Sequence, residues 1–337
     1  MTSPSKNNFS LKAYNTFGIE AYVAHFSIFS SVVEAIAVCK AHIAPLLILG
    51  GGSNILLTKN ITGTVALNNI TGINITEESQ HNLIVKVGAG YNWHKFVGYC
   101  MQQGYYGLEN LALIPGTVGA APIQNIGAYG VEVSNLIYKV EFINQTTNNL
   151  EVLYNGDCKF AYRDSIFKTE LKNKTIITHV YFMLSKKQTI NKSYESLNNY
   201  FEAHNIKNPQ PLQVFDAVIA IRNSKLPNPA ELGNAGSFFK NPEISMEAFN
   251  VLKYKFNNVV AFNTKKNTMK LAAGWLIEQC GFKGYRNGDA GCYQKQALVL
   301  VNYGSATGQE IYNLSEKIIN AVTDKFNVLL EREVNIL

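Results

Sequence analysis

Three short segments of the sequence carry side chains that could act on a charged substrate. Arg163 lies in the segment 161–165 beside Tyr162, and its fixed guanidinium fork suits a carboxylate or an enolate. A structural pairing with Asp164 would explain this arginine equally well. Ser237 follows Asn-Ala-Gly and precedes two phenylalanines, which predicts a hydroxyl on a tight turn beside a hydrophobic wall. An ordinary turn serine is the alternative, and the absence of a histidine nearby argues against a hydrolase-type nucleophile.

The third segment is 328–337, which alternates between apolar and polar residues. Because side chains of a strand point to opposite faces in turn, the apolar residues share one face: Val328, Leu330, Val334 and Ile336. Glu331 and Glu333 then share the other face. Both carboxylates could be solvent-facing, and one of them could serve a reaction.

A glycine-rich stretch at 107–130 is the centre of the sequence pattern. Its five glycines and two prolines allow backbone N–H groups to approach a ligand closely, and a ligand with phosphates is the natural candidate. Gln124, Asn125 and Tyr129 are neutral hydrogen-bonding residues, which suit the edge of a heterocycle. A buried loop that only turns between packed elements is the alternative interpretation.

A second glycine-rich loop favours the ligand-binding interpretation. The apolar run 46–49 leads into three glycines followed by Ser53 and Asn54, a pattern typical of a strand and a phosphate-cradling turn. It has neither the glycine order of a Rossmann crossover nor the Lys-Ser/Thr ending of a P-loop. Residues 88–93 place a tryptophan where a third glycine would stand, and we interpret them as a strand-to-helix turn.

Five motifs together resemble one known family. They are LGGGSN at 49–54, IPGTVGAAPIQNIGAYG at 114–130, YRDS at 162–165, AGSFFKNP at 235–242 and LEREV at 330–334. This set is similar to the UDP-N-acetylenolpyruvoylglucosamine reductases, the flavoenzymes of peptidoglycan synthesis. The motifs span almost the whole chain in the expected order, so the set is far more specific than any one of them.

The resemblance implies an activity and roles for individual residues. Non-covalent FAD, reduced by NADPH, would reduce UDP-N-acetylglucosamine enolpyruvate to UDP-N-acetylmuramate. Ser237 would donate a proton to the carbanionic carbon, while Arg163 and Glu333 would polarise the intermediate. The uridine diphosphate part would be bound by Tyr194, Lys225 and Asn241. The implied FAD contacts are Gly50, Gly51, Gly52, Ser53, Asn54, Gly116, Thr117, Gln124, Asn125, Gly127, Ala128 and Tyr129.

The resemblance also implies a domain plan. The expected fold is α+β, with a two-part FAD-binding domain of the PCMH/vanillyl-alcohol-oxidase type and then a smaller α+β substrate-binding domain. The expected ranges are 14–190 for the FAD-binding domain, 191–213 for a tyrosine-containing substrate loop, 214–327 for the C-terminal domain and 328–337 for a terminal strand. The long polar loop around Tyr194 matches the tyrosine-loop subtype. Arg332 stands where a proline commonly precedes the catalytic Glu, and Ala120-Ala121 replaces a glycine pair.

The amino-acid composition and the net charge limit the kinds of ligand and partner that are expected for this protein. The chain has 337 residues, of which 47% are hydrophobic and 16% are charged, as in an ordinary globular protein. The formal charge of +6 without a dense Lys/Arg block predicts a small anionic ligand rather than nucleic acid. We found neither a run of 18 apolar residues nor a signal region, so a cytoplasmic monomer with no membrane partner is expected. Five scattered cysteines predict free thiols, and dispersed histidines predict no metal site.

Hydrophobic spacing and turn residues predict the elements that hold these segments. Helices are expected at 31–42, where Ser31 and Glu34 have capping-box spacing, at 93–101 ending before Gly104, at 214–221 and at 271–279. A further helix is expected from 307 to 326, with Thr307 and Glu310 at its cap and an apolar stripe on one face: Ile311, Leu314, Ile318, Val322 and Phe326. Strands are expected at 46–49, 64–67, 70–75, 83–87, 131–143, 149–154, 175–184 and 297–301. The polar stretch 185–211 is either an exposed linker or a functional loop, since it is long for a structureless connection.

Two other functions remain open. An FAD-dependent oxidase of sugars or alcohols could use the same flavin fold, and a non-enzymatic flavin- or nucleotide-binding protein could use the same loops. Release of the flavin on denaturation would disfavour an oxidase that tethers its flavin covalently. Substrate-dependent consumption of NADPH would exclude the non-enzymatic protein.

Overall fold

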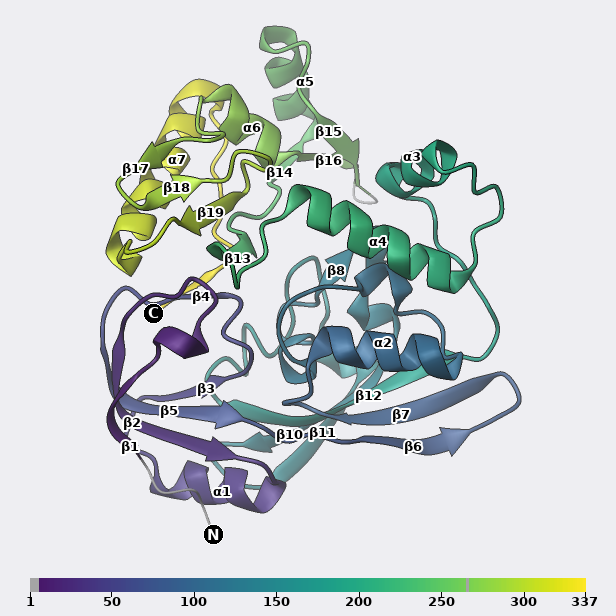
Figure 1. The fold of residues 1–337 in the computed structure, drawn as a ribbon, viewed down its shortest axis with the longest axis vertical. Helices are drawn as coiled ribbons and strands as arrows, with labels where there is room; N and C mark the ends of the chain where they lie inside the picture. The colour runs from purple at the N-terminus through teal and green to yellow at the C-terminus, as the bar shows by residue number, and fades with distance from the viewer. Residues whose placement is uncertain (1–5, 265–266) are drawn as a thin grey trace. The chain divides into compact units, whose positions relative to one another are not determined.

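A computed structural model describes residues 6–264 and 267–337. Its internal contacts form two compact units, and each unit takes more than one stretch of the chain. The first unit holds the described residues up to Phe9, Tyr22–Gly52 and Ile61–Ser224, and the second holds Ser10–Ala21, Ser53–Asn60 and Lys225–Leu337. Both units combine helices with strands (Figure 1), which confirms the predicted α+β class.

One sheet of the first unit is built around parallel pairs. The order is β1 (Lys6–Ser10), β2 (Tyr22–Phe29), β5 (Ile61–Asn68) and β3 (Leu46–Leu49), with β5 parallel to both β2 and β3. Helix α1 (Val32–Ala41) begins at the predicted cap, where the Ser31 hydroxyl accepts a hydrogen bond from the Glu34 N–H. Strand β3 thus ends at the glycine-rich loop 50–54.

The second sheet of this unit carries most of its core. The order is β11 (Leu150–Tyr154), β10 (Ile137–Asn144), β12 (Thr175–Ser185), β7 (Asn82–Gly88) and β6 (Ile73–Glu78), and every pair is antiparallel. Helices α2 (Trp93–Gln103) and α4 (Pro211–Lys225) contribute to the same buried cluster. Gly104 ends α2 with a φ of 70°, as the glycine stop predicted.

The described residues of the second unit form two sheets of three and four strands, a separate two-stranded pair and three α-helices. One sheet has the order β13 (Gly233–Ser237), β19 (Val299–Asn302), β18 (Ala290–Cys292) and β17 (Arg286–Asn287), and the other has β14 (Glu243–Ser245), β16 (Thr268–Leu271) and β15 (Ala261–Asn263). The helices are α5 (Met246–Lys255), α6 (Ala273–Gln279) and α7 (Gly308–Phe326). A parallel pair joins β4 (Ile55–Leu56) to β20 (Asn335–Ile336).

Helix α7 forms as predicted because its first turn and its apolar stripe agree. Thr307 and Glu310 make a complete capping box, which satisfies two N–H groups at the helix start. The predicted stripe is buried: Ile311, Leu314, Ile318, Val322 and Phe326. The helix is therefore a rigid support for whatever packs on it.

Several predicted boundaries were wrong. The expected strand at 131–143 is divided into β9 (Val131–Glu132) and β10 by a 3-10 turn at Val133–Asn135. The expected strand at 70–75 begins later, at Ile73, after Gly72 with a φ of 113°. The segment 328–337 is extended, but a regular strand covers only β20.

Helices also changed the domain plan. The expected loop 191–213 contains helix α3 (Glu195–Ala203), whose Leu197 and Phe201 are buried in the first unit. Helix α4 belongs to that unit too, rather than to a domain starting at 214, because Val214 and Val218 lie in the same core. In the described part of the chain, no helix is both long and apolar enough to cross a membrane.

Candidate active site

The two glycine-rich loops touch each other inside the first unit. A Cβ atom on Gly51 would lie 2.8 Å from the Gly116 Cα, and one on Gly50 would lie 2.6 Å from the Thr117 Oγ1. Real Cβ contacts of this length would force the backbones apart. Glycine is therefore required at both positions so that the loops can approach.

The same loops present backbone donors. Among the described residues, the N–H groups of Gly50, Gly51, Gly116 and Thr117 donate to no protein acceptor. Their residues are half-buried or exposed, so the N–H groups can reach a ligand. Clustered N–H groups of this kind bind phosphate oxygens, and the donor set fits the diphosphate of FAD.

The glycine-rich stretch 107–130 is fixed by the turn between β7 and α2, which confirms the predicted strand-to-helix turn at 88–93. The N–H of Gly119 donates to the Ala89 carbonyl at 2.8 Å, and that of Val118 donates to the Tyr91 carbonyl at 2.9 Å. In return, the Trp93 N–H donates to the Gly116 carbonyl at 3.1 Å. A folded core element thus holds the donors in place.

Asn125 is the most buried polar residue of the loop. Its Nδ2 donates to the Ala161 carbonyl at 2.9 Å and to Glu132 at 3.1 Å, and its Oδ1 accepts from the Ser134 N–H at 3.0 Å. Its φ of 44° lies in the left-handed region. The side chain therefore holds the loop together, and the contact with a cofactor stays a prediction.

Arg163 is bound to the backbone of this loop beside β8 (Gly127–Ala128). Its Nη2 donates to the Gly127 carbonyl at 2.6 Å, and its Nη1 donates to the Asn125 carbonyl at 3.4 Å. The guanidinium carbon lies 5.3 Å from the Tyr162 ring centroid. A φ of 54° is unfavourable for an arginine, and strain of this kind is concentrated at functional sites.

Ser237 and Glu333 are neighbours in the second unit. Strand β13 ends at Ser237, and the next residue, Phe238, accepts a hydrogen bond from the Glu333 N–H at 2.8 Å. The Asn54 Nδ2 donates to the Glu333 carbonyl at 3.3 Å. The structure therefore brings the backbone of Glu333 next to the residue that follows Ser237, which lies about a hundred positions earlier in the sequence.

The two terminal glutamates have different surroundings. The predicted alternation is confirmed, since Val328, Leu330 and Val334 are buried. Glu331 forms an ion pair with Lys240 at 2.9 Å, and its side chain is 69% exposed. Glu331 is thus a surface residue, and the catalytic role of Glu333 stays a prediction.

The three predicted substrate residues do not lie in one unit. Tyr194 precedes α3 in the first unit, is 48% exposed, and has its ring centroid 5.3 Å from that of Tyr129. Lys225 and Asn241 belong to the second unit. Asn241 Oδ1 accepts from the Ala273 N–H at 3.0 Å, which gives this side chain a structural role at the start of α6.

Arg222 on α4 was missed in the sequence. Its side chain faces Tyr129, and it forms no hydrogen bond or ion pair with any described residue. Burial lowers the pKa of its guanidinium, and burial raises the pKa of the Tyr129 hydroxyl. Its spacing of four from the buried Val218 was a signal that this arginine points inward.

His94 on α2 completes this cluster. Burial, together with the nearby Arg222 cation, lowers the pKa of His94, so the ring is neutral at neutral pH. Its Nδ1 accepts a hydrogen bond from the Leu113 N–H at 3.1 Å, which leaves the proton on Nε2. A buried arginine that forms no ion pair with a described residue and lies near the Tyr129 hydroxyl is an arrangement that suits an anion.

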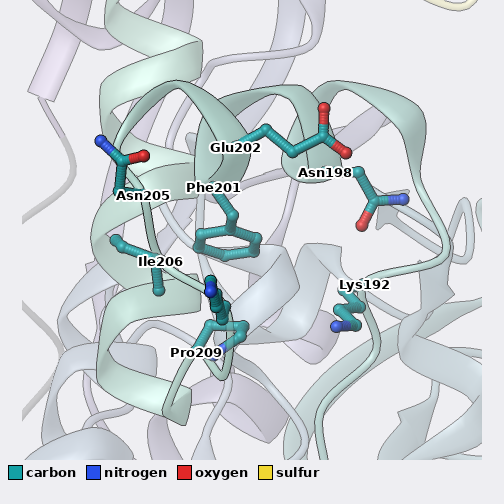
Figure 2. Close-up of a pocket in the computed structure, with 8 residues that line it drawn as sticks. Lys192, Asn198, Phe201, Glu202, Asn205, Ile206 and Pro209 are labelled. Atoms are coloured by element: carbon teal, nitrogen blue, oxygen red, sulfur yellow. The ribbon is translucent and has the colours of Figure 1, made fainter.

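A pocket lies elsewhere in the first unit, under α3 (Figure 2). It encloses about 390 Å³ and is lined by Lys192, Asn198, Phe201, Glu202, Asn205, Ile206, Lys207 and Pro209. None of the predicted site residues is among them. The pocket therefore does not mark the candidate active site.

A family model described as "UDP-N-acetylenolpyruvoylglucosamine reductase, C-terminal domain" matches residues 228–337, and one described as "FAD binding domain" matches 22–151. The reductase of Chromobacterium violaceum is 45% identical over 341 residues, covering 100% of both chains. The chain belongs to the UDP-N-acetylenolpyruvoylglucosamine reductase family. The reductase of Flavobacterium johnsoniae agrees, with 46% identity over 98% of this chain and 99% of its own.

A solved reductase of the family supports the fold. The crystal structure from Thermus caldophilus has a TM-score of 0.70, 21% identity, and coverage of 100% of this chain and 99% of its own. With the "FAD binding domain" match, it confirms the predicted flavin-binding fold type for the first part of the chain.

Proposed function

We propose that this protein is an FAD-dependent UDP-N-acetylmuramate dehydrogenase. NADPH is the reductant, and UDP-N-acetylglucosamine enolpyruvate is the substrate. The observation that carries the proposal is the hydrogen bond from the Glu333 N–H to the Phe238 carbonyl, because it places the Glu333 backbone beside the turn that holds Ser237, in a chain of this family. The phosphate-binding donors of the two glycine-rich loops support the cofactor.

The chemistry that FAD supplies when bound is two-electron hydride transfer, from NADPH and then to C3 of the enolpyruvyl group. Ser237 donates the proton that C2 requires, since a hydroxyl at the end of β13 is exposed to a ligand. Glu333, together with Arg163, polarises the intermediate, as the family resemblance implies. Arg163 binds the substrate carboxylate through donors of its fork, while its contacts with Gly127 and Asn125 keep the guanidinium in place.

The anionic part of the substrate requires cations and hydrogen-bond donors. We assign Arg222 with Tyr129 to a phosphate of the uridine diphosphate. Tyr194, Lys225 and Asn241 stay the contacts that the family resemblance implies. An arginine that has no protein anion gains most from a ligand that brings one. Tyr194 is exposed at the edge of Tyr129, so its hydroxyl can reach the same group.

A spectrum of the purified protein tests the cofactor and the donor together. We expect a yellow protein that releases its flavin on denaturation and is bleached by NADPH without oxygen. Adding the enolpyruvyl substrate should restore the colour and yield UDP-N-acetylmuramate. A protein that cannot be loaded with flavin, or one that reoxidises only with oxygen, would contradict the proposal; the second result would point to an oxidase.

A further inference from the structure

Arg332 ties the terminal segment to one face of α7. Its Nε donates to the Ser315 Oγ at 2.8 Å, and its Nη2 donates to the Glu316 Oε1 at 2.6 Å. The guanidinium carbon lies 4.6 Å from the Tyr312 ring centroid. Three contacts of different kinds, from residues spaced three and four apart on a helix, define one position for this side chain.

The contacting residues are themselves fixed. Ser315 is fully buried, and its hydroxyl donates to the Tyr312 carbonyl at 2.6 Å, so its oxygen is oriented to accept from Arg332. Glu316 has its pKa lowered by hydrogen bonds from Tyr312 and Arg332, so it stays charged at neutral pH. Arg332 therefore binds a preorganised part of a helix whose first turn is fully capped.

The backbone on either side of Arg332 is bonded to the segment after β13, since the Lys240 N–H donates to the Glu331 carbonyl at 2.9 Å. Arg332 forms an isolated bridge with Phe239, and a regular strand begins only at Asn335. The next residue along the chain is Glu333, whose N–H donates to Phe238 beside Ser237. Because side chains alternate along an extended segment, holding Arg332 on α7 directs Glu333 to the opposite side.

We propose that Arg332 is a positioning residue that holds the Glu333 carboxylate at its working position beside Ser237. This inference rests on the proposed function, since it requires Glu333 to act in substrate reduction. The side chain contributes through geometry, because its donors are used by α7 and none of the described contacts joins it to the Glu333 carboxylate. Misplacement of a reacting group by about 1 Å costs about 100-fold in rate.

Rapid-mixing kinetics of the flavin-loaded protein test this role. In Arg332→Ala, we expect kcat for substrate reduction to fall by about 10- to 100-fold, with a smaller change in KM. Flavin reduction by NADPH should stay within about twofold of the wild type, because that half-reaction does not use Glu333. Glu316→Gln, which keeps the fold and weakens one contact, should lower the same kcat by less. Unchanged substrate reduction in both variants would overturn the inference.

A double mutant separates positioning from general structure. If Arg332 acts through Glu333, Arg332→Ala should slow a Glu333→Gln protein by no more than about twofold, because residues that act as a unit are not additive. Full additivity of the two losses would contradict a positioning role. Glu331→Gln is the matched control, since it breaks the exposed pair with Lys240 on the other side of the same segment, and we expect it to behave as the wild type.

The outcomes distinguish this inference from the proposed function. If Glu333→Gln slows substrate reduction and Arg332→Ala does not, the role of Arg332 is wrong and the function stands. If Glu333→Gln has no effect, the assignment of Glu333 fails, and the positioning role fails with it.

Discussion

Ser237 offers the sharpest test among single residues. In Ser237→Ala the proton donor is lost, so substrate reduction should slow by about 100- to 10,000-fold, the usual contribution of general acid catalysis. Flavin reduction by NADPH needs no proton from this hydroxyl and should stay unchanged. Stopped-flow measurement of each half-reaction decides the matter, and equal slowing of both would contradict the assignment.

Arg222 leads to a prediction about substrate affinity. Arg222→Met keeps the length and the apolar stem but removes the cation, and it should weaken substrate binding by about 1.5–3 kcal/mol, the value of a hydrogen bond to a charged group. Isothermal titration of the flavin-loaded protein measures this loss. Lys207→Met, a lysine at the pocket under α3, is the control. Equal affinity in wild type and Arg222→Met would show that the arginine binds no phosphate.

Single residues were predictable where sequence neighbours defined them. The close approach of the two glycine-rich loops and the alternation around Glu333 follow from local patterns that the structure confirms, whereas the roles of Arg163 and Glu333 stay predictions. Arg222 was not found because its partner, Tyr129, is distant in sequence, and only packing brings the two together. The structural roles of Asn125 and Asn241 could not be predicted either, because each side chain bonds to backbone groups of other segments.

At the level of elements, the contact between the two glycine-rich loops can be tested by measuring how much flavin the purified protein binds. Gly51→Ala places a Cβ against the Gly116 backbone, so the loops must separate and the shared donors lose their spacing. We expect less bound FAD after purification, measured by the ratio of flavin to protein absorbance. Gly98→Ala is the control: a Cβ there meets no atom within 4 Å inside α2, and the change should stabilise the protein by about 0.5–1 kcal/mol.

The sheet around β10 predicts a dependence of stability on acid. Glu141 is buried between Lys86 at 3.3 Å and His179 at 2.7 Å, and the hydrogen bond from His179, with the Lys86 cation, lowers the pKa of Glu141 from 4.5 to about 2. The carboxylate therefore stabilises the fold fully above pH ~4.5, and the contribution, on the order of 3 kcal/mol, is lost as pH falls toward 2.

Urea unfolding between pH 7 and 3 measures this effect. Glu141→Gln should be less stable at pH 7 and should show a weaker loss of stability on acidification than the wild type. Glu77→Gln, a change on the exposed surface of β6, should follow the wild-type curve. Parallel curves for the wild type and Glu141→Gln would show that another group governs the acid response.

Helices were predicted best where the hydrophobic periodicity and a capping residue agreed. Helices α1, α2 and α7 have both, and each begins or ends where the capping residue predicted. Helix α3 lies in a polar, proline-containing stretch, and only its burial against the core of the first unit shows why it forms. The terminal strand is short because Arg332 anchors to a helix and leaves little regular ladder.

The whole molecule interleaves its two units along the chain. A family model matches 228–337 as one domain, yet the second unit also needs two early segments. The Phe17 carbonyl accepts from Asn302 at 2.9 Å, and Leu56 and Leu57 are 0% and 1% exposed. A fragment of residues 225–337 would therefore lack part of its own core.

Because the second unit takes segments from three parts of the chain, the behaviour of that fragment can be predicted. Residues 225–337 expressed alone should show no cooperative thermal unfolding by circular dichroism, because β20 loses its partner β4 and α7 loses its packing on Leu57. A fusion that restores residues 10–21 and 53–60 through a linker should recover at least part of the transition. A cooperative transition of the short fragment near that of the full chain would refute the prediction.

During synthesis, strand β4 is translated long before its partner β20. The Thr58 hydroxyl donates to the Leu337 carbonyl across 279 positions. At about 5–20 residues per second, the apolar residues of β4 leave the ribosome about 14–56 s before β20 exists. Throughout that interval the edge of β4 lacks its partner and can pair with another chain, so translation of β20 ends a period in which the nascent protein can aggregate.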